Sequence, residues 1–500
     1  MLELRVDWRA SLDLTGRVLT YLVVPLSFPL GVALYYGESV LPFLSAIAVA
    51  LVVGGAFRQL PGTPGELGPR EAFLGVSLIW LLVAAIGAVP FYVAGTGILA
   101  HPVDAMFEAM SGLTTTGATV LRDFSAHSRA IMMWRQVLQW LGGLGILVLA
   151  TAILSELGVG GAQLMETETR TRNVDKLTPR ISQTAQLLWG LYGALTVLAA
   201  AVFYALHLLG LAPNMTLYNA VAHALTSVST AGFSPEPESV GAFRPVVQWA
   251  VVPFMLVGAT NFVLLYVALQ GEPRRLLRSD EFHFYLGVVG LGALLVGAGL
   301  MADPSIAYGP EATARHAVFN VVSIVTTTGY ASADFQLWSP AAKHVLFLCM
   351  FVGGMAGSTT CSIKSLRWLV AVKSLRRGLF TSIHPEAIRP VRISGEPVDE
   401  TTIRDIYGYL LLSVLVFVVF TVFIVVDGAR ANEAVTEFEA LGASASTVLN
   451  IGPAFGEAGP YGTYARFPRT TRLAMVVLMW VGRIEFVPVL VLFTRAFWTS

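Results

Sequence analysis

Long apolar stretches alternate with short polar segments along almost the whole chain. Ten of these stretches are long enough to cross about 30 Å of hydrocarbon as helices. They cover approximately residues 18–36, 41–57, 72–95, 130–155, 184–211, 245–269, 284–302, 343–372, 405–426 and 473–498. The pattern therefore predicts an all-α polytopic membrane protein.

Four shorter apolar runs, each ending in a polar segment and a glycine, lie between the long stretches. They read SGLTTTG, TSVSTAG, SIVTTTG and STVLNIG, and end at Gly117, Gly232, Gly329 and Gly452. A hydroxyl residue stands six positions before each glycine, and a polar residue stands thirteen positions before it: Ser111, Thr226, Ser323 and Ser446, and Asp104, Asn219, His316 and Glu439. This shared register indicates an internal repeat.

The repeating unit is a span, a short helix, a glycine loop and a second span. Two spans return the chain to the same side, so the repeats are expected to be parallel around an axis along the membrane normal. The first two spans stand outside this scheme. The sequence predicts a two-helix extension and four repeats, at residues 1–70, 71–156, 157–271, 272–400 and 401–500, with pore loops at 103–120, 216–235, 312–332 and 435–456.

The short helices are expected to enter and leave the membrane from one face. A helix of about 11 residues rises only about 16 Å, half of the bilayer. The glycine loop that follows then lies at membrane depth, where non-helical backbone must be buried in protein or line a water-filled cavity. Four such loops around one axis predict a central pore.

The loop chemistry favours a cation. Glycine permits backbone angles that turn successive carbonyl groups in one direction, and a ring of carbonyl oxygens replaces the hydration shell of a cation. Each short helix also directs its partially negative C-terminal end toward the axis, and Thr114–Thr116 and Thr326–Thr328 add hydroxyl oxygens. The alternative, that each glycine merely ends a helix, explains one copy better than four in register.

The stretch 343–372 contains a glycine-rich break. Gly353, Gly354, Gly357, Ser358, Thr359 and Thr360 have poor helix propensity. We expect the span to unwind there and the break to face the pore below the filter. The alternative is a tightly packed interface of small residues between helices. Arg483 lies deep in the last stretch and needs a cavity or a partner.

Composition and charge narrow the function. The 500 residues are 55% hydrophobic and 13% charged, and the formal net charge of zero does not suggest a nucleic-acid partner. The chain has no HExxH sequence, no phosphate-binding glycine motif and two cysteines in one segment, Cys349 and Cys361. We therefore predict no enzyme activity and no cofactor in this chain.

Basic residues fall on alternate loops, which sets the orientation. These loops are expected to be cytoplasmic, and both termini with them. They contain Arg5, Arg9 and Arg17; Arg58 and Arg70; Arg170, Arg172, Lys176 and Arg180; Arg274, Arg275 and Arg278; and the group from Lys364 to Arg404. Arg466, Arg469 and Arg472 lie on the opposite side and weaken the pattern. No cleavage site follows the first span, which is expected to be retained.

The segments TTTGAT, STAGFS, TTTGYAS and NIGPAFG resemble the four filter segments of the Trk/Ktr/HKT superfamily of potassium transporters, and the resemblance covers essentially the whole chain. Two extra N-terminal spans favour the TrkH type of membrane subunit. The resemblance implies one pore per subunit, formed by four pseudo-repeats, and a homodimer in the bacterial cytoplasmic membrane. It also implies a cytosolic nucleotide-binding partner of the TrkA type. The basic segment from Lys373 to Arg392 is expected to dock this partner or lipid headgroups at the cytoplasmic face.

The resemblance assigns potassium to a filter of twelve residues: Thr115, Thr116, Gly117, Thr230, Ala231, Gly232, Thr327, Thr328, Gly329, Asn450, Ile451 and Gly452. Relatives with serine in place of the first glycine tend to favour sodium, so Gly117 implies potassium, with rubidium following and sodium weaker. Leu449, Asn450 and Ile451 depart from the hydroxyl pattern, which makes the site less symmetric. The resemblance also implies that the stretch Gly353–Thr360 is an intramembrane gate. It further implies that Arg483 raises the barrier to cations when this gate is closed. The alternative for Arg483 is an anchor bonded to loop carbonyls.

Several further residues have two interpretations each. Asp123, Glu236, Glu238, Asp334 and Glu457 follow the glycines and form either an outer cation-concentrating vestibule or ordinary solvated loops. Glu108, His223 and Asn320 are expected to hold the short helices by hydrogen bonds rather than to bind ions. Glu485 is not expected to pair with Arg483.

The leading hypothesis is a potassium-selective, channel-like uptake protein driven by the membrane potential. The alternative in the same fold is a proton- or sodium-coupled potassium symporter. Glu108 and Glu485 are the carboxylates that such coupling would use.

Overall fold

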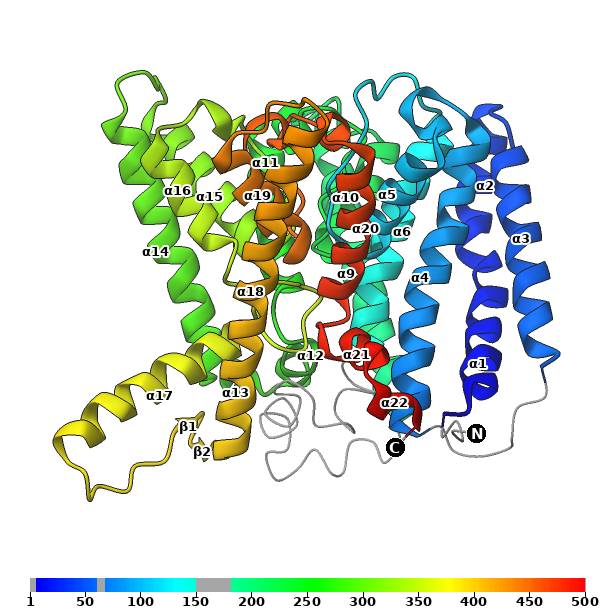
Figure 1. Cartoon of the computed structure of the whole chain (residues 1–500). Helices are drawn as coiled ribbons and strands as arrows, with labels where there is room; N and C mark the ends of the chain where they lie inside the picture. Colours follow the sequence, from blue (N-terminus) through cyan, green and yellow to red (C-terminus); the bar gives the residue numbers. More distant parts are fainter. Residues whose placement is uncertain (1–5, 61–67, 150–180, 500) are drawn as a thin grey trace.

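The computed structural model describes residues 6–60, 68–149 and 181–499. The regular secondary structure of the described part is helical apart from one short hairpin and one isolated bridge (Figure 1). Six of the described helices are long and apolar enough to cross a membrane, or eight if each of two bent pairs counts as one span. The predicted fold class is confirmed. The basic residues 170–180 and the predicted boundary at 156/157 lie outside the described residues.

The N-terminal extension has three helices. α1 (Trp8–Tyr21) and α2 (Val23–Tyr36) form one span, and α3 (Leu41–Arg58) returns beside them. The prediction that this span begins near residue 18 is wrong: the helix begins at Trp8, and two of its polar residues, Ser11 and Thr15, are buried against protein. Ser11 is buried and its hydroxyl donates to the carbonyl of Glu71 at 3.0 Å. A β-carbon on Gly16 would lie 2.7 Å from the carbonyl oxygen of Gly54, so α1 and α3 are in close contact.

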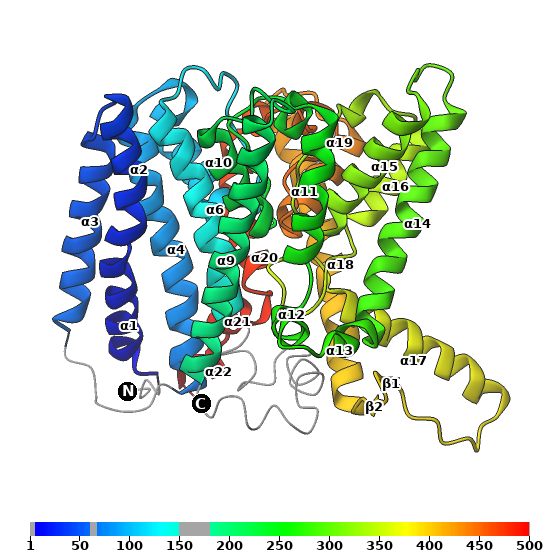
Figure 2. The same cartoon turned by 180° about the vertical axis from the view of Figure 1, so that it is seen from behind.

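We call the face on which α1 begins the terminal face, and the opposite face, where α2 ends and α3 begins, the loop face. The remaining helices follow the predicted order of span, short helix and span (Figures 1 and 2). Their bounds are α4 (Pro69–Ala94), α5 (Pro102–Leu113), α6 (Arg129–Leu149), α9 (Ile181–Leu208), α10 (Leu217–Val228), α11 (Pro245–Gly258), α12 (Phe262–Leu269), α13 (Pro273–Leu277), α14 (Asp280–Ala302), α15 (Pro310–Val325), α16 (Pro340–Cys349), α17 (Ser365–Ile383), α18 (Glu400–Arg430), α19 (Glu437–Val448), α20 (Arg469–Arg483), α21 (Val487–Leu490) and α22 (Arg495–Thr499).

Five predicted spans coincide with α3, α4, α9, α14 and α18 to within a few residues. Short 3-10 helices lie in the connections, at Gly97–Ala100, Ser239–Ala242, Phe335–Leu337, Gly456–Ala458, Tyr464–Arg466 and Val491–Phe493. Helix α17 projects from the side of the molecule at the terminal face (Figure 1). After it, the strands β1 (Arg392–Ile393) and β2 (Glu396–Pro397) form an antiparallel hairpin, with Arg392 opposite Pro397.

The short helices α5, α10, α15 and α19 begin with local signals. Pro102 and Pro310 occupy the first turns of α5 and α15, where the missing N–H is not needed. Thr216 and Thr436 cap α10 and α19, their hydroxyls accepting from the amides of Asn219 and Glu439. All four helices are largely buried, and the glycine segments follow their C-terminal ends.

Two stretches predicted as continuous spans are bent. The chain turns by 103° between α11 and α12, and by 114° between α20 and the α21 segment. At the first bend, the amide of Phe262 donates to the carbonyl of Gly357 at 3.0 Å, and the amide of Met355 donates to the carbonyl of Ala259 at 2.9 Å. A distant segment of the chain thus supplies the partners that a continuous helix would have found within itself.

Candidate functional site

The four glycine segments share one backbone conformation. In each, the residue two positions before the glycine and the glycine itself have positive φ. The angles are 54° and 79° for Thr115 and Gly117, 50° and 77° for Thr230 and Gly232, 51° and 79° for Thr327 and Gly329, and 53° and 108° for Asn450 and Gly452. Positive φ is uncommon for residues that carry a β-carbon. Its recurrence at the equivalent position of all four segments shows that the segments share one specific backbone conformation.

The hydroxyl residue six positions before each glycine anchors its segment. Its carbonyl accepts from the amide of the residue before the glycine, with N···O distances of 2.9 Å for Ser111 and Thr116, 3.0 Å for Thr226 and Ala231, 2.8 Å for Ser323 and Thr328, and 2.9 Å for Ser446 and Ile451. The serine hydroxyls also donate across the segment, to the carbonyls of Ala118, Tyr330 and Gly452. Thr226 instead bonds to the Tyr330 hydroxyl of the following segment.

The four segments meet in a closed ring. A β-carbon on each glycine would lie closer than 3.0 Å to the carbonyl oxygen of the residue before the next glycine. The order is Gly117 to Ala231, Gly232 to Thr328, Gly329 to Ile451, and Gly452 back to Thr116. Every predicted filter segment therefore contacts its neighbours, and no side chain fits at the four glycines.

The ring is rich in oxygen and poor in charge. Within it, the hydroxyls of Thr114 and Thr116 lie 2.7 Å apart, as do those of Thr326 and Thr328. The fourth segment differs, as its sequence suggests. The Asn450 amide donates to the Thr116 hydroxyl at 2.8 Å and to the Met479 carbonyl at 2.9 Å, which ties the last segment to the first.

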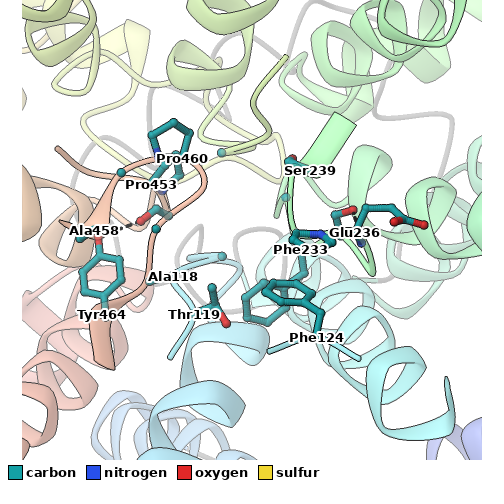
Figure 3. A pocket seen from close by; sticks show the side chains of 18 of the residues that line it. Ala118, Thr119, Phe124, Phe233, Glu236, Ser239, Pro453, Ala458, Pro460 and Tyr464 are labelled. Atoms are coloured by element: carbon teal, nitrogen blue, oxygen red, sulfur yellow. Dashed lines mark hydrogen bonds between the residues drawn. The ribbon is translucent and has the colours of Figure 1, made fainter. Parts of the chain in front are cut away.

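A cavity opens above the ring on the loop face, lined by all four glycines (Figure 3). Of the acidic residues predicted for a vestibule, Glu236 lines it. Glu457 pairs with Arg466 at 2.8 Å, and Asp334 caps a 3-10 helix. The Asp123 carboxylate does not line the cavity. It accepts hydrogen bonds from the hydroxyl and the amide of Ser125, which lower the pKa of this exposed carboxylate.

The glycine-rich stretch is non-helical from residue 350 to 364, between α16 and α17, so the predicted break in this span is confirmed. We call residues 350–364 the intramembrane loop. Gly357 has a φ of 75°. A β-carbon on Gly354 would lie 2.7 Å from the carbonyl oxygen of Ala259, and one on Gly353 would overlap the carbonyl of Cys361. These contacts explain why this stretch is glycine-rich.

The intramembrane loop contacts all four segments of the ring at the side facing the terminal face. The hydroxyls of Thr359 and Thr230 lie 2.9 Å apart, and the amide of Cys361 donates to the Thr327 hydroxyl at 2.9 Å. The Cys361 sulfur lies 3.7 Å from the Thr115 hydroxyl, and the amide of Ser362 donates to the Leu449 carbonyl at 3.1 Å. The loop thus lies across the base of the ring.

Arg483 is buried, at 2% exposed, and binds this loop. Its guanidinium donates to the carbonyl of Thr359 at 3.1 Å, to the sulfur of Cys361 at 2.6 Å and to the carbonyl of Gly142 on α6 at 2.8 Å. Glu485 does not pair with it, as predicted, and lies 2.5 Å from Arg367 on α17 instead. The Arg483 guanidinium therefore lies, buried, beside the loop that covers the ring.

Glu108, His223 and Asn320 make the hydrogen bonds expected of supports. The Glu108 carboxylate accepts from the Arg135 guanidinium at 2.7 Å, the Thr119 hydroxyl at 2.9 Å and the Val120 amide at 3.0 Å. His223 lies 3.0 Å from the Ser234 hydroxyl, and the Asn320 amide donates to the Ser332 hydroxyl at 2.9 Å. Each of these three side chains joins its short helix to the segment that follows the glycine of the same repeat.

Sequence reasoning missed several supports. Gln139 on α6 donates to the carbonyl of Ala231 at 2.6 Å and accepts from the amide of Phe233 at 2.8 Å. Arg135 lies one turn away, and the placement of two polar residues within an apolar span was the available signal. Cys361, for which no role was predicted, contacts both Arg483 and the ring. Asp104 forms a buried ion pair with Arg472 of α20.

Comparisons with known proteins agree with this architecture. Residues 43–290 and 293–499 match the TrkH family, described as a cation transport protein. The chain is 36% identical to the Trk system potassium uptake protein TrkH of Halomonas elongata, over 98% of this chain and 99% of that protein. It is 33% identical to the protein of the same name in Escherichia coli K12, over 99% and 100%.

A crystal structure of the potassium transporter TrkH from Vibrio parahaemolyticus superimposes with a TM-score of 0.87 at 30% identity, covering 99% of this chain and 100% of that one. The sequence match covers nearly all residues after the first span, and the structural match includes the ring, the intramembrane loop and the N-terminal extension. The chain belongs to the TrkH family of cation transport proteins.

Proposed function

We propose that this chain takes up potassium across the bacterial cytoplasmic membrane through a selective pore whose filter is the ring of four glycine segments. The observation that carries the proposal is the closed cycle of contacts from Gly117 through Gly232 and Gly329 to Gly452. The relatives named above are potassium uptake proteins or a potassium transporter.

The filter chemistry supports a weakly hydrated monovalent cation. The twelve filter residues are Thr115, Thr116, Gly117, Thr230, Ala231, Gly232, Thr327, Thr328, Gly329, Asn450, Ile451 and Gly452. They offer carbonyl, hydroxyl and amide oxygens without a carboxylate. Carbonyl rings of this type replace the hydration shell of potassium, and the four short helices direct their partially negative ends toward the ring. Rubidium follows potassium in this proposal, and sodium passes less well.

The intramembrane loop is the gate in this proposal, formed by Gly353, Gly354, Gly357, Ser358, Thr359 and Thr360, with Arg483 as its electrostatic part. The hydrogen bonds of the loop to the base of the ring support a closed gate. A guanidinium beside an ion path repels cations strongly where water is excluded. The same hydrogen bonds make Arg483 an anchor of the closed loop, so its two predicted roles are compatible.

The two carboxylates that coupled symport would use are both held in ion pairs, which favours the channel mechanism. Glu108 is bound to Arg135, and Glu485 is bound to Arg367, all within the described part of the chain. Each carboxylate is held in an ion pair with an arginine, whereas a group that carries the coupling ion must be free to bind and release it. The membrane potential then supplies about 2.3 kcal/mol per charge per 100 mV.

We also propose the assembly and orientation that the family implies. The terminal face is cytoplasmic, the four repeats occupy 71–156, 157–271, 272–400 and 401–500 around one pore, and two chains form a homodimer. A nucleotide-binding subunit of the TrkA type docks on the cytoplasmic face. The basic residues Arg376, Arg377 and Arg389, in and after α17, support this docking.

Cation flux into proteoliposomes tests the proposal. The purified chain is given potassium, rubidium or sodium under an imposed voltage, without a pH or sodium gradient. Uptake of potassium and rubidium over sodium is expected. Uptake that requires an added proton or sodium gradient would replace the channel with a symporter, and equal uptake of sodium would refute the filter.

A further inference from the structure

A second cavity lies on the loop face between α2, α6 and α10, outside the ring. Its volume of about 1120 Å³ is slightly above the range of about 300–1,000 Å³ that is usual for small-molecule sites. The three helices lie side by side at this face (Figure 2), and the connections before α6 and after α10 complete the wall. No part of the mechanism proposed above uses this cavity.

The cavity is apolar at depth. One face of α2 lines it along two turns, with Phe28, Gly31 and Val32 below Tyr35 and Tyr36, and Met132 and Met133 of α6 lie opposite. A β-carbon on Gly31 would meet no atom within 4 Å, so the space beside this glycine is open. The deep part is therefore a groove suited to a hydrocarbon chain.

The rim of the groove is polar and carries opposite charges. The exposed Arg129 contributes a guanidinium, 4.5 Å above the Tyr36 ring, and Glu236 contributes a carboxylate. Tyr218 donates to the carbonyl of Arg129 at 2.8 Å. His127 is uncharged at neutral pH, since burial and the nearby Arg135 lower its pKa to about 4. Tyrosines above an apolar groove are typical of the membrane interface.

We propose that this groove binds a phospholipid with a zwitterionic headgroup from the leaflet at the loop face. An acyl chain lies along α2 over Gly31, the phosphate binds Arg129, and the headgroup ammonium binds Glu236. The two opposite charges on the rim favour this class over an anionic phospholipid, whose headgroup brings no cation to the Glu236 carboxylate and is repelled by it.

The bound lipid lies against the entrance of the pore. Phe124 and Glu236 line both this groove and the cavity above the ring. The Arg135 guanidinium, which also lines the entrance, lies 5.4 Å from the Phe124 ring. A lipid in the groove therefore fixes one wall of the ion entrance, and its removal frees that wall to move.

Native mass spectrometry of the full chain tests the proposal. The protein, freed of endogenous lipid, is titrated with phosphatidylethanolamine and with phosphatidylglycerol of the same acyl chains. We expect one tightly bound phosphatidylethanolamine per chain, and weaker phosphatidylglycerol by about tenfold, the typical effect of one charge-assisted hydrogen bond.

Two glycine variants separate the groove from general lipid contact. Gly31→Phe fills the open space and should weaken phosphatidylethanolamine binding by at least about tenfold, since it removes apolar area from the site. Gly290→Phe on α14 is the matched control. Gly290 is also an exposed helical glycine with no atom within 4 Å of its β-carbon, and its replacement should leave binding unchanged. Glu236→Gln should reduce the preference for phosphatidylethanolamine.

Either of two results would overturn the proposal: equal binding of the two lipids by the natural chain, or equal loss of binding in both glycine variants. The same spectra report oligomeric state. If Gly31→Phe converts dimers to monomers and leaves lipid binding intact, the groove holds a second copy of the chain and not a lipid.

Discussion

The ring depends on glycine for two separate reasons at each of its four positions. The left-handed φ, 79° at Gly117 and 77° at Gly232, costs about 1–3 kcal/mol for a residue with a β-carbon. The β-carbon would also overlap the neighbouring segment, whose carbonyl oxygen lies in its place. A substitution must therefore alter two adjacent segments together, which links the identity of these residues to the geometry of the proposed ion site.

Gly117→Ser should reduce discrimination between potassium and sodium by about tenfold or more, because a distortion worth about 1.4 kcal/mol changes a ratio by that factor. Flux of the two ions into proteoliposomes measures it. Gly190→Ser on α9 is the control, since Gly190 is exposed and no atom lies within 4 Å of its β-carbon. Unchanged selectivity in Gly117→Ser would refute the filter assignment.

The buried pair of Glu108 and Arg135 supports the first segment and should matter to stability. Glu108→Gln leaves the Arg135 guanidinium, 1% exposed, without its carboxylate and should cost about 3–5 kcal/mol. Glu457→Gln breaks the exposed pair with Arg466 and should cost less than about 1 kcal/mol. Thermal unfolding in detergent compares them. Similar melting temperatures for both variants would show that the Glu108 pair contributes no more than a surface contact.

At the scale of elements, the intramembrane loop and the bend between α11 and α12 stabilise each other. The loop has no regular structure to satisfy its amides and carbonyls, and the bend has lost its own helical partners. Asn261 at the bend donates to the Ala356 carbonyl at 2.8 Å, and Glu281 of α14 accepts from the amides of Ala356 and Leu366 at 2.7 and 3.1 Å. The proposed gate would therefore open by exchanging hydrogen bonds rather than by breaking a packed core.

Arg483→Gln should raise voltage-driven potassium flux in the absence of any partner, by about tenfold or more. Two like unit charges about 8 Å apart repel each other by about 2 kcal/mol at an effective dielectric constant of about 20, which is enough for a tenfold change in rate. Arg17→Gln, which removes an exposed charge paired with Asp13 on α1, is the control and should leave flux unchanged. Lower or unchanged flux in a folded Arg483→Gln protein would exclude Arg483 as a barrier.

At the scale of the whole molecule, the sequence predicts the membrane class, most spans and the register of the four segments. The reason is that hydrophobic length and a repeated glycine pattern are local properties. The bends escape prediction because 245–269 is apolar throughout, and the groups that satisfy its break lie about a hundred residues later, at Met355 and Gly357. The early start of α1 escapes for a similar reason, since its Ser11 is buried and bonded to Glu71 of α4, about sixty residues later.

Contacts between distant residues could not be predicted either. The positions of Glu108 and Arg135, of Asp104 and Arg472, and of Arg367 and Glu485 in the sequence do not reveal which charges pair. The prediction that Arg483 and Glu485 do not pair is confirmed, but not for the reason of helix faces, because α20 ends at Arg483 and Glu485 lies in the bend that follows.

The most direct test of the filter is anomalous diffraction from crystals of the protein grown in rubidium. Our account predicts a rubidium peak on the axis of the ring, within coordination distance of oxygens from all four segments, and its loss when sodium replaces rubidium. A ring without a peak, or a peak coordinated by residues elsewhere in the chain, would contradict it.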